Sequence, residues 1–175
     1  TGKPVWSWNA GYTNRMYSPA VCQPAAVGGR IFIVAPDRAM TCLDASTGQE
    51  IWRKKWPGVR VRESMGLTRD SSLVLVKTME GSVYGVSASA DSMQLSWQAK
   101  VRLGYEICPT PIATSAGRIY VPTQSGLVVA VSRKTGTVLW KHKISNCLVN
   151  SILTQKHRRL IVSTMDGKIT CLKTR

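Results

Sequence analysis

Long apolar runs, histidines and phosphate-binding loops are scarce or missing in this sequence. No apolar run approaches the roughly 18 residues that a membrane-spanning helix requires, so no membrane span is expected. The two histidines, His142 and His157, lie among Lys and Arg residues, without a cysteine or carboxylate at ligand or triad spacing. No glycine-rich loop opens a helix. We therefore expect no catalytic, cofactor-binding or metal-ligating residue.

The cysteines show neither an adjacent pair nor the spacing of a metal site, and their odd number argues against a disulfide framework. Cys42 and Cys171 occupy equivalent positions in the repeat described below, where small residues stand in the other copies. We therefore expect the cysteines to be buried core thiols. They are Cys22, Cys42, Cys108, Cys147 and Cys171.

Acidic residues are also few. Nine Asp and Glu stand against 24 Lys and Arg, which gives a formal net charge of +15. This charge favours anionic partners. However, the basic clusters fall at different points of the repeat, and no aromatic residues are interleaved with them as base stacking requires. We therefore do not expect nucleic acid; a basic surface for another anionic partner and a merely solvated surface both stay open. The clusters are Arg53–Lys55, Arg60 with Arg62, Lys141–Lys143, and Lys156–Arg159.

Four tryptophans recur at a nearly constant spacing. Trp6, Trp52, Trp97 and Trp140 are separated by 46, 45 and 43 residues. Between them the apolar residues alternate with period two, as half-buried strands require. Repeats of about 40 to 50 residues built from short strands are typical of β-propeller blades, each a four-stranded antiparallel sheet. The sequence therefore predicts an all-β fold, a β-propeller with about four blades in this chain.

Glycines mark the turns of each copy. Some follow Glu, Ser or Asp in hairpin turns that need a positive φ, and others follow Thr directly before the strand that carries the tryptophan. Ala90–Met93 replaces this Thr-Gly turn in one copy, which puts the geometry of that turn in doubt. We predict that the repeated residues form the scaffold, with each indole in the wedge between two blades. They are Trp6, Trp52, Trp97, Trp140, Gly48, Gly81, Gly126, Gly136 and Gly167.

The repeat resembles the pyrroloquinoline quinone (PQQ)-like propeller family, also called quinoprotein alcohol dehydrogenase-like. The pattern of that family is an Asp-Gly hairpin, an Ala-Leu-Asp segment, a Thr-Gly turn and a following Trp. The copies most similar to it here are Asp37–Trp52 and Ser125–Trp140, and Asp166–Leu172 is a partial copy. This similarity spans nearly the whole chain. The resemblance implies that outer-membrane assembly lipoproteins, sensor domains and propellers appended to enzymes are relatives of this chain. It also implies a complete ring of about seven or eight blades.

On this pattern the chain is one propeller segment, expected to be the C-terminal part of a larger propeller. Two alternatives are a closed four-blade ring and two chains that pair into an eight-blade ring, and open blade faces would favour self-association. In the first blade we expect strands near Tyr17–Val21, Arg30–Val34, Met40–Leu43 and Glu50–Lys54. The expected units are a closing strand at residues 1–11, blades at 12–57, 58–101 and 102–144, and an incomplete blade at 145–175.

Enzymes of this family hold a quinone and calcium on the propeller axis, against a disulfide of neighbouring cysteines, with a stacking tryptophan and an aspartate base. This chain has no Cys-Cys pair and no aspartate near the start of an inner strand. We therefore expect a non-enzymatic segment without PQQ or calcium. A quinoprotein oxidoreductase fragment and an accessory to an upstream enzymatic domain are the alternatives.

The loops that lead into the innermost strands differ most between the copies. They combine Tyr, Arg, Glu and Asn, residue types that suit a recognition surface. We therefore predict a binding or assembly platform for a protein partner or an upstream domain of the same polypeptide, and the resemblance implies the periplasm or cell envelope. The candidate binding residues are Asn14, Arg15, Tyr17, Arg60, Arg62, Glu63, Tyr105, Glu106 and Asn146.

Overall fold

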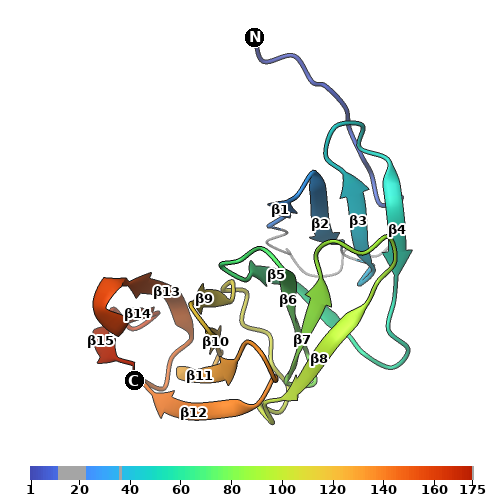
Figure 1. Cartoon of the computed structure of the whole chain (residues 1–175). Helices are drawn as coiled ribbons and strands as arrows, with labels where there is room; N and C mark the ends of the chain where they lie inside the picture. The colour runs from blue at the N-terminus through green and yellow to red at the C-terminus, as the bar shows by residue number, and fades with distance from the viewer. Residues whose placement is uncertain (12–22, 36, 175) are drawn as a thin grey trace.

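The computed structural model describes residues 1–11, 23–35 and 37–174, and this part of the chain is built from four antiparallel sheets (Figure 1). Each sheet follows the chain order, so every strand pairs with its sequence neighbour. Blade 1 consists of β1 (Ala25–Val27), β2 (Arg30–Val34), β3 (Met40–Asp44) and β4 (Glu50–Lys54). Blade 2 consists of β5 (Val61–Leu67), β6 (Leu73–Thr78), β7 (Ser82–Ser87) and β8 (Leu95–Lys100).

The C-terminal half repeats this plan. Blade 3 consists of β9 (Ala113–Ser115), β10 (Arg118–Pro122), β11 (Leu127–Ser132) and β12 (Val138–Lys143). Blade 4 consists of β13 (Val149–Gln155), the 3-10 turn η1 (Lys156–Arg158), β14 (Arg159–Thr164) and β15 (Ile169–Lys173). The first strands of successive blades contact one another, and the four sheets follow an arc in Figure 1. The predicted all-β propeller fold is thus confirmed.

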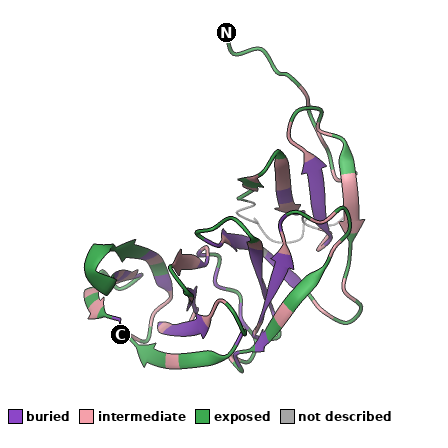
Figure 2. Cartoon of the chain, viewed as in Figure 1, coloured by how far each residue is buried: buried purple, intermediate pink, exposed green. Residues whose placement is uncertain are grey.

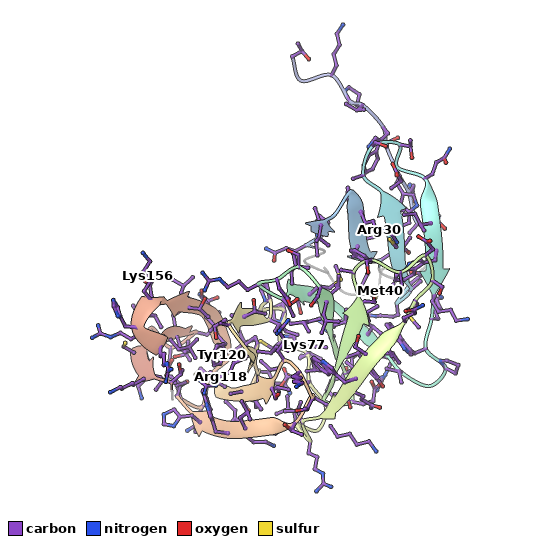
Figure 3. All side chains as sticks on the ribbon, in the orientation of Figure 1. Arg30, Met40, Lys77, Arg118, Tyr120 and Lys156 are labelled. Atoms are coloured by element: carbon purple, nitrogen blue, oxygen red, sulfur yellow. The ribbon has the colours of Figure 1, made fainter. Side chains whose placement is uncertain are left out.

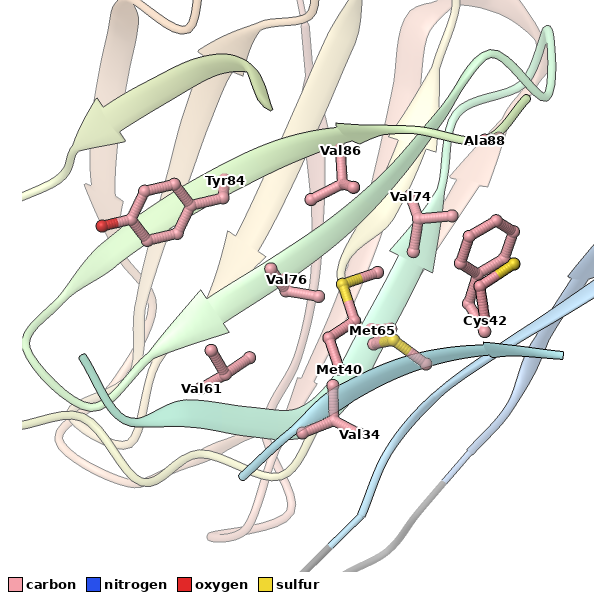
Figure 4. Close-up of a cluster of buried hydrophobic side chains, with 11 residues drawn as sticks. Val34, Met40, Cys42, Val61, Met65, Val74, Val76, Tyr84, Val86 and Ala88 are labelled. Carbon is pink, nitrogen blue, oxygen red and sulfur yellow. The ribbon is translucent and has the colours of Figure 1, made fainter. Parts of the chain in front are cut away.

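The apolar core lies between the blades. One buried cluster joins blades 1 and 2, a second joins blades 2 and 3, and a third joins blades 3 and 4. Val34 and Met40 from blade 1 pack against Val61 and Val76 from blade 2 in the first cluster (Figure 4). The central strands are therefore buried, whereas the fourth strands are largely exposed or intermediate (Figure 2).

Tryptophans connect blade 1 to blade 2 and blade 2 to blade 3. The Trp52 and Trp97 Nε1–H groups donate to the backbone oxygens of Ala90 and Arg133, at 3.3 and 2.8 Å, in the turn before the fourth strand of the following blade. Trp6 donates in the same way to the Ala45 oxygen, at 3.0 Å. Residues 1–11 form no strand in the structure, yet Trp6 occupies the same kind of site.

The turn that departs from the Thr-Gly pattern is longer. In blade 2 the Ser87 N–H bonds to the Gln94 oxygen, whereas in blade 1 the Asp44 N–H bonds to the Gln49 oxygen. The longer loop still carries Ala90, which accepts the Trp52 hydrogen bond, so it changes one turn and keeps the contact between blades. The strand predicted at Tyr17–Val21 lies outside the described residues.

Alternation of turns gives the propeller two faces. The turns between first and second strands and between third and fourth strands share what we call the hairpin face. The turns between second and third strands (79–81, 123–126, 165–168) and the connections between blades (55–60, 101–112, 144–148) share the linker face. Backbone hydrogen bonds tie each set together, such as Arg133 N to Gly117 O on the hairpin face and Ile144 N to Gly126 O on the linker face.

Candidate functional site

The exposed centre of the predicted binding surface is a pair of side chains on the linker face. The Arg60 Nε–H donates to Glu80 Oε1 at 2.9 Å, and the Arg60 guanidinium carbon lies 5.6 Å from the centroid of the Tyr105 ring. Arg60 comes from the connection between blades 1 and 2, and Tyr105 from the connection between blades 2 and 3. The Tyr105 residue is 56% exposed. Two connections thus place an aromatic ring and a cation side by side at the surface.

Glu80 fixes this arrangement from the β6–β7 turn. Its second oxygen accepts the backbone N–H of Arg60 at 3.2 Å. Burial raises the pKa of the Glu80 carboxyl, but the hydrogen bonds from Arg60 outweigh this and hold the pKa below its ordinary value. Glu80 is therefore charged at neutral pH, and it limits the rotamers that Arg60 can adopt.

Arg62 and Glu106, two other candidate residues, lie inside the molecule. They are 8% and 2% exposed. Glu106 Oε1 accepts the backbone N–H groups of Cys108 and Gln124, at 2.7 and 2.9 Å. Arg62 donates through Nη2 to the Ile107 oxygen at 3.2 Å. Both side chains hold the connection between blades 2 and 3 in place. They are not part of the exposed surface, because their polar atoms bond to the backbone of this connection.

The sequence prediction did not include Lys77, which is also buried at this connection. Lys77 is 1% exposed, and its Nζ donates to the oxygens of Cys108 and Thr110, both at 2.8 Å. Burial lowers the pKa of this ammonium group to about 8. Figure 3 shows Lys77 in the interior of the molecule, near its centre. The period-two pattern of β6 could have indicated its burial, because Lys77 is in phase with Leu73 and Leu75.

The remaining candidates are spread more widely. Asn146 is exposed in the connection between blades 3 and 4. Asn14, Arg15, Tyr17 and the side chain of Glu63 lie outside the described part of the chain. The five scaffold glycines, Gly48, Gly81, Gly126, Gly136 and Gly167, all have positive φ.

The cysteines differ in their environments. Cys42 and Cys108 are buried, as expected for core thiols, but Cys147 is intermediate and Cys171 is exposed. Cys171 is exposed because it lies on β15, which pairs with β14 along one edge, and Cys22 lies outside the described residues. Over residues 1–11, 23–35 and 37–174, no three His, Cys, Asp or Glu side chains are grouped closely enough to hold a metal ion. No helix in the same ranges has the length and apolar character of a membrane span.

Known proteins share this repeat and fold. The family model described as outer membrane protein assembly factor BamB matches residues 1–104 and 81–175. The BamB protein of Burkholderia pseudomallei (strain K96243) is 31% identical over 139 residues, which cover 79% of this chain and 33% of that protein. The chain thus spans about a third of the length of this relative.

Solved structures with little sequence identity show the same fold. The computationally designed Ika4 protein superposes with a TM-score of 0.78 over 99% of both chains, at 15% identity. BamB from Moraxella catarrhalis superposes with a TM-score of 0.63 over 83% of this chain and 43% of that chain, at 18% identity. Together with the family match, the propeller repeats show that this chain belongs to the PQQ-like β-propeller family described as outer membrane protein assembly factor BamB.

Proposed function

We propose that this chain is part of a non-catalytic propeller that serves as a protein-binding platform in the bacterial cell envelope. Family membership supports this proposal, since the curated relatives are named as outer membrane protein assembly factors. The partner is a second protein or another domain of the same polypeptide. The observation that carries the proposal for this chain is the exposed Arg60–Tyr105 pair on the linker face.

The pair has the properties of an interface anchor. Tyr and Arg are, with Trp, the residue types enriched among side chains that dominate binding energy. Arg60 is already held by Glu80 and by the Tyr105 ring, so it loses less conformational entropy when a partner binds. The exposed face of Tyr105 supplies apolar area beside a fixed charge. A partner with an acidic or carbonyl-rich edge and an apolar contact would fit this surface.

We further propose that this segment binds neither PQQ nor calcium. The buried polar side chains at the connection between blades 2 and 3 bond to the chain itself: Lys77 and Arg62 donate to backbone oxygens and Glu106 accepts backbone N–H groups. These bonds position the connection between blades 2 and 3. Full-length protein purified with added PQQ and calcium is expected to show no quinone absorbance, and bound quinone would contradict this part of the proposal.

Site-specific photo-cross-linking in the source cells tests the platform. A photoreactive phenylalanine analogue replaces Tyr105 in the full-length protein, and the same analogue at Leu95, which is 47% exposed on the outer strand β8, is the matched control. We expect a cross-linked envelope protein from position 105 that is missing from position 95. Arg60→Glu should abolish this product, whereas Lys100→Glu on β8 should leave it unchanged. Identical products from both positions, or no effect of Arg60→Glu, would rule out this surface.

A further inference from the structure

A cleft on the hairpin face, between blades 3 and 4, is lined mainly by basic and hydroxyl side chains. Its volume is about 560 Å³. The β9–β10 turn and the β13–β14 turn form its two sides, and Figure 3 shows Arg118, Tyr120 and Lys156 in this part of the molecule. The basic residues that line it are Arg69, Arg118, Lys156, His157, Arg158 and Arg159.

No carboxylate lines this cleft among the described residues, because the acidic side chains are engaged elsewhere. Asp70 pairs with Arg133, and Asp91 pairs with Arg30. On the linker face, Glu80 pairs with Arg60. Asp37 pairs with Arg53 and Lys55, Glu50 lies near Arg53, Glu106 is buried, and Asp44 and Asp166 accept hydrogen bonds within their own turns. The cations of the cleft therefore repel one another, with no described carboxylate among the residues that line it.

The β13–β14 turn has a strained backbone at two of the basic residues that line the cleft. His157 and Arg158 have φ of 62° and 57°, in the left-handed region. The corresponding turn of blade 1 uses Gly28 and Gly29, with φ of 56° and 73°. Residues with a side chain disfavour this backbone conformation, whereas glycine adopts it readily. Strain of this kind clusters at functional sites, although Ser71 in the equivalent turn of blade 2 also has a positive φ, of 60°. In blade 4 the strained turn places an imidazole and a guanidinium at the cleft.

An equivalent arginine in blade 1 shows how such a position binds an anion. Arg30, Arg118 and Arg159 each begin the second strand of their blade. Arg30 donates through Nη2 to Asp91 Oδ1 and through Nη1 to the Ala90 oxygen, both at 2.6 Å. Arg118 is half-buried at the same point of blade 3 and faces the cleft. Its guanidinium can offer the same two donors, and no carboxylate among the described residues lines the cleft to accept them.

We propose that this cleft binds a phosphate-bearing small molecule or headgroup with more than one negative charge. Arginine forks match phosphate oxygens bidentately, and lysine adds a point charge. The Tyr120 hydroxyl, 3.3 Å from Ser115 Oγ, adds a hydroxyl pair on one side. The volume suits a small molecule rather than a single phosphate. Tyr120 is 1% exposed, so it offers no stacking platform for nucleic-acid bases.

Calorimetry and vesicle flotation on the purified chain test the proposal. The probes are inorganic pyrophosphate, and phosphatidylcholine vesicles with or without phosphatidic acid. Binding of pyrophosphate would indicate a soluble phosphate-bearing molecule as the ligand, and binding of phosphatidic acid vesicles alone would indicate a lipid headgroup; either result supports the cleft. If neither probe binds, the proposal is wrong.

Charge-matched variants separate the cleft from the overall charge of the protein. Lys156→Gln, Arg158→Gln and Arg159→Gln combined should weaken binding at least about tenfold, because the loss of even one charge-assisted hydrogen bond costs about that factor. Lys3→Gln, Lys54→Gln and Lys100→Gln combined remove the same charge at exposed positions outside the cleft, and should leave binding within about twofold. Equal weakening in both triple variants would refute a specific site.

A glycine variant keeps the test independent of folding. His157→Gly with Arg158→Gly relieves the backbone strain of the turn, so its melting temperature should equal or exceed that of the wild type while phosphate binding weakens. Full binding by this variant would show that the two side chains are not used. These results concern the hairpin face, so they leave the linker-face platform to be judged separately.

Discussion

Gly136→Ala is expected to weaken the contact between blades 2 and 3. Gly136 has a φ of 71°, and an added Cβ would lie 2.9 Å from Cε3 and 3.1 Å from Cδ2 of Trp97. The left-handed conformation costs an alanine about 1 to 2 kcal/mol. Overpacking against the indole adds about 1 to 3 kcal/mol. We therefore expect Gly136→Ala to lower the free energy of unfolding by about 2 to 5 kcal/mol.

Gly117→Ala is the matched control. Gly117 has a φ of 79°, and no atom outside its chain neighbours lies within 4 Å of an added Cβ. This variant carries the backbone cost alone, about 1 to 2 kcal/mol. The difference between the two variants therefore isolates the contact of Gly136 with the indole.

Urea unfolding followed by far-UV circular dichroism measures both variants, alone and combined with Trp97→Ala. Trp97→Ala removes the ring and the 2.8 Å hydrogen bond to Arg133, and is expected to cost about 3 to 5 kcal/mol. Without the ring, Gly136→Ala should cost no more than Gly117→Ala, and the double-mutant cycle should show this coupling. Equal costs of Gly136→Ala and Gly117→Ala in the wild type, or an unchanged cost without Trp97, would refute the wedge as described.

Two further predictions concern ionisable groups. The pKa of Lys77 is about 8 in the folded chain and about 10.4 in the unfolded chain, so the unfolded chain binds more protons between these values. The stability of the wild type relative to Lys77→Met should therefore rise by up to about 3 kcal/mol across this pH range; a constant difference in urea titrations would contradict it. Asp44 Oδ1 accepts the side-chain and backbone donors of Ser46 and Thr47, which lower its pKa to about 2. Asp44→Ala should be less stable than the wild type at neutral pH, and thermal melts should show the difference vanishing as the pH falls from about 4 to about 2; a difference that persists at the lower pH would count against these bonds.

The propeller could be predicted from the sequence because every blade repeats the same pattern of buried strand residues and the same tryptophan position. Period-two burial fixes which strand residues enter the core, and the tryptophan spacing fixes the length of each blade. The fold and the family could be predicted for these reasons. The details of single turns could not, because they depend on contacts that occur once. The longer blade 2 turn, for example, still presents the Ala90 oxygen to Trp52.

The binding surface was harder to predict than the fold. Arg60 and Arg62 are two residues apart in one connection, yet Arg60 is exposed and Arg62 is 8% exposed. The direction of each side chain depends on the connection between blades 2 and 3. There the Ile107 backbone oxygen accepts a hydrogen bond from Arg62, and the Tyr105 ring lies against the Arg60 guanidinium. Such partners are distant in sequence and include backbone oxygens, which leave no mark on residue type. For Lys77, the period-two pattern of β6 could have indicated burial, but not the Cys108 and Thr110 oxygens to which its Nζ donates.

The described ion pairs offset part of the net charge of +15 on both faces, but not at every cluster of cations. On the linker face the acidic residue Glu80 lies beside Arg60. On the hairpin face, blades 1 to 3 are linked by the ion pairs of Arg30 with Asp91 and of Arg133 with Asp70. The cleft at the β13–β14 turn has no such acid among the described residues. Because salt screens exposed charges strongly, binding at the cleft, with its several cations, should weaken steeply with ionic strength, whereas binding through Tyr105 and the single cation of Arg60 should weaken less. The salt dependence of a given partner thus shows which face it uses.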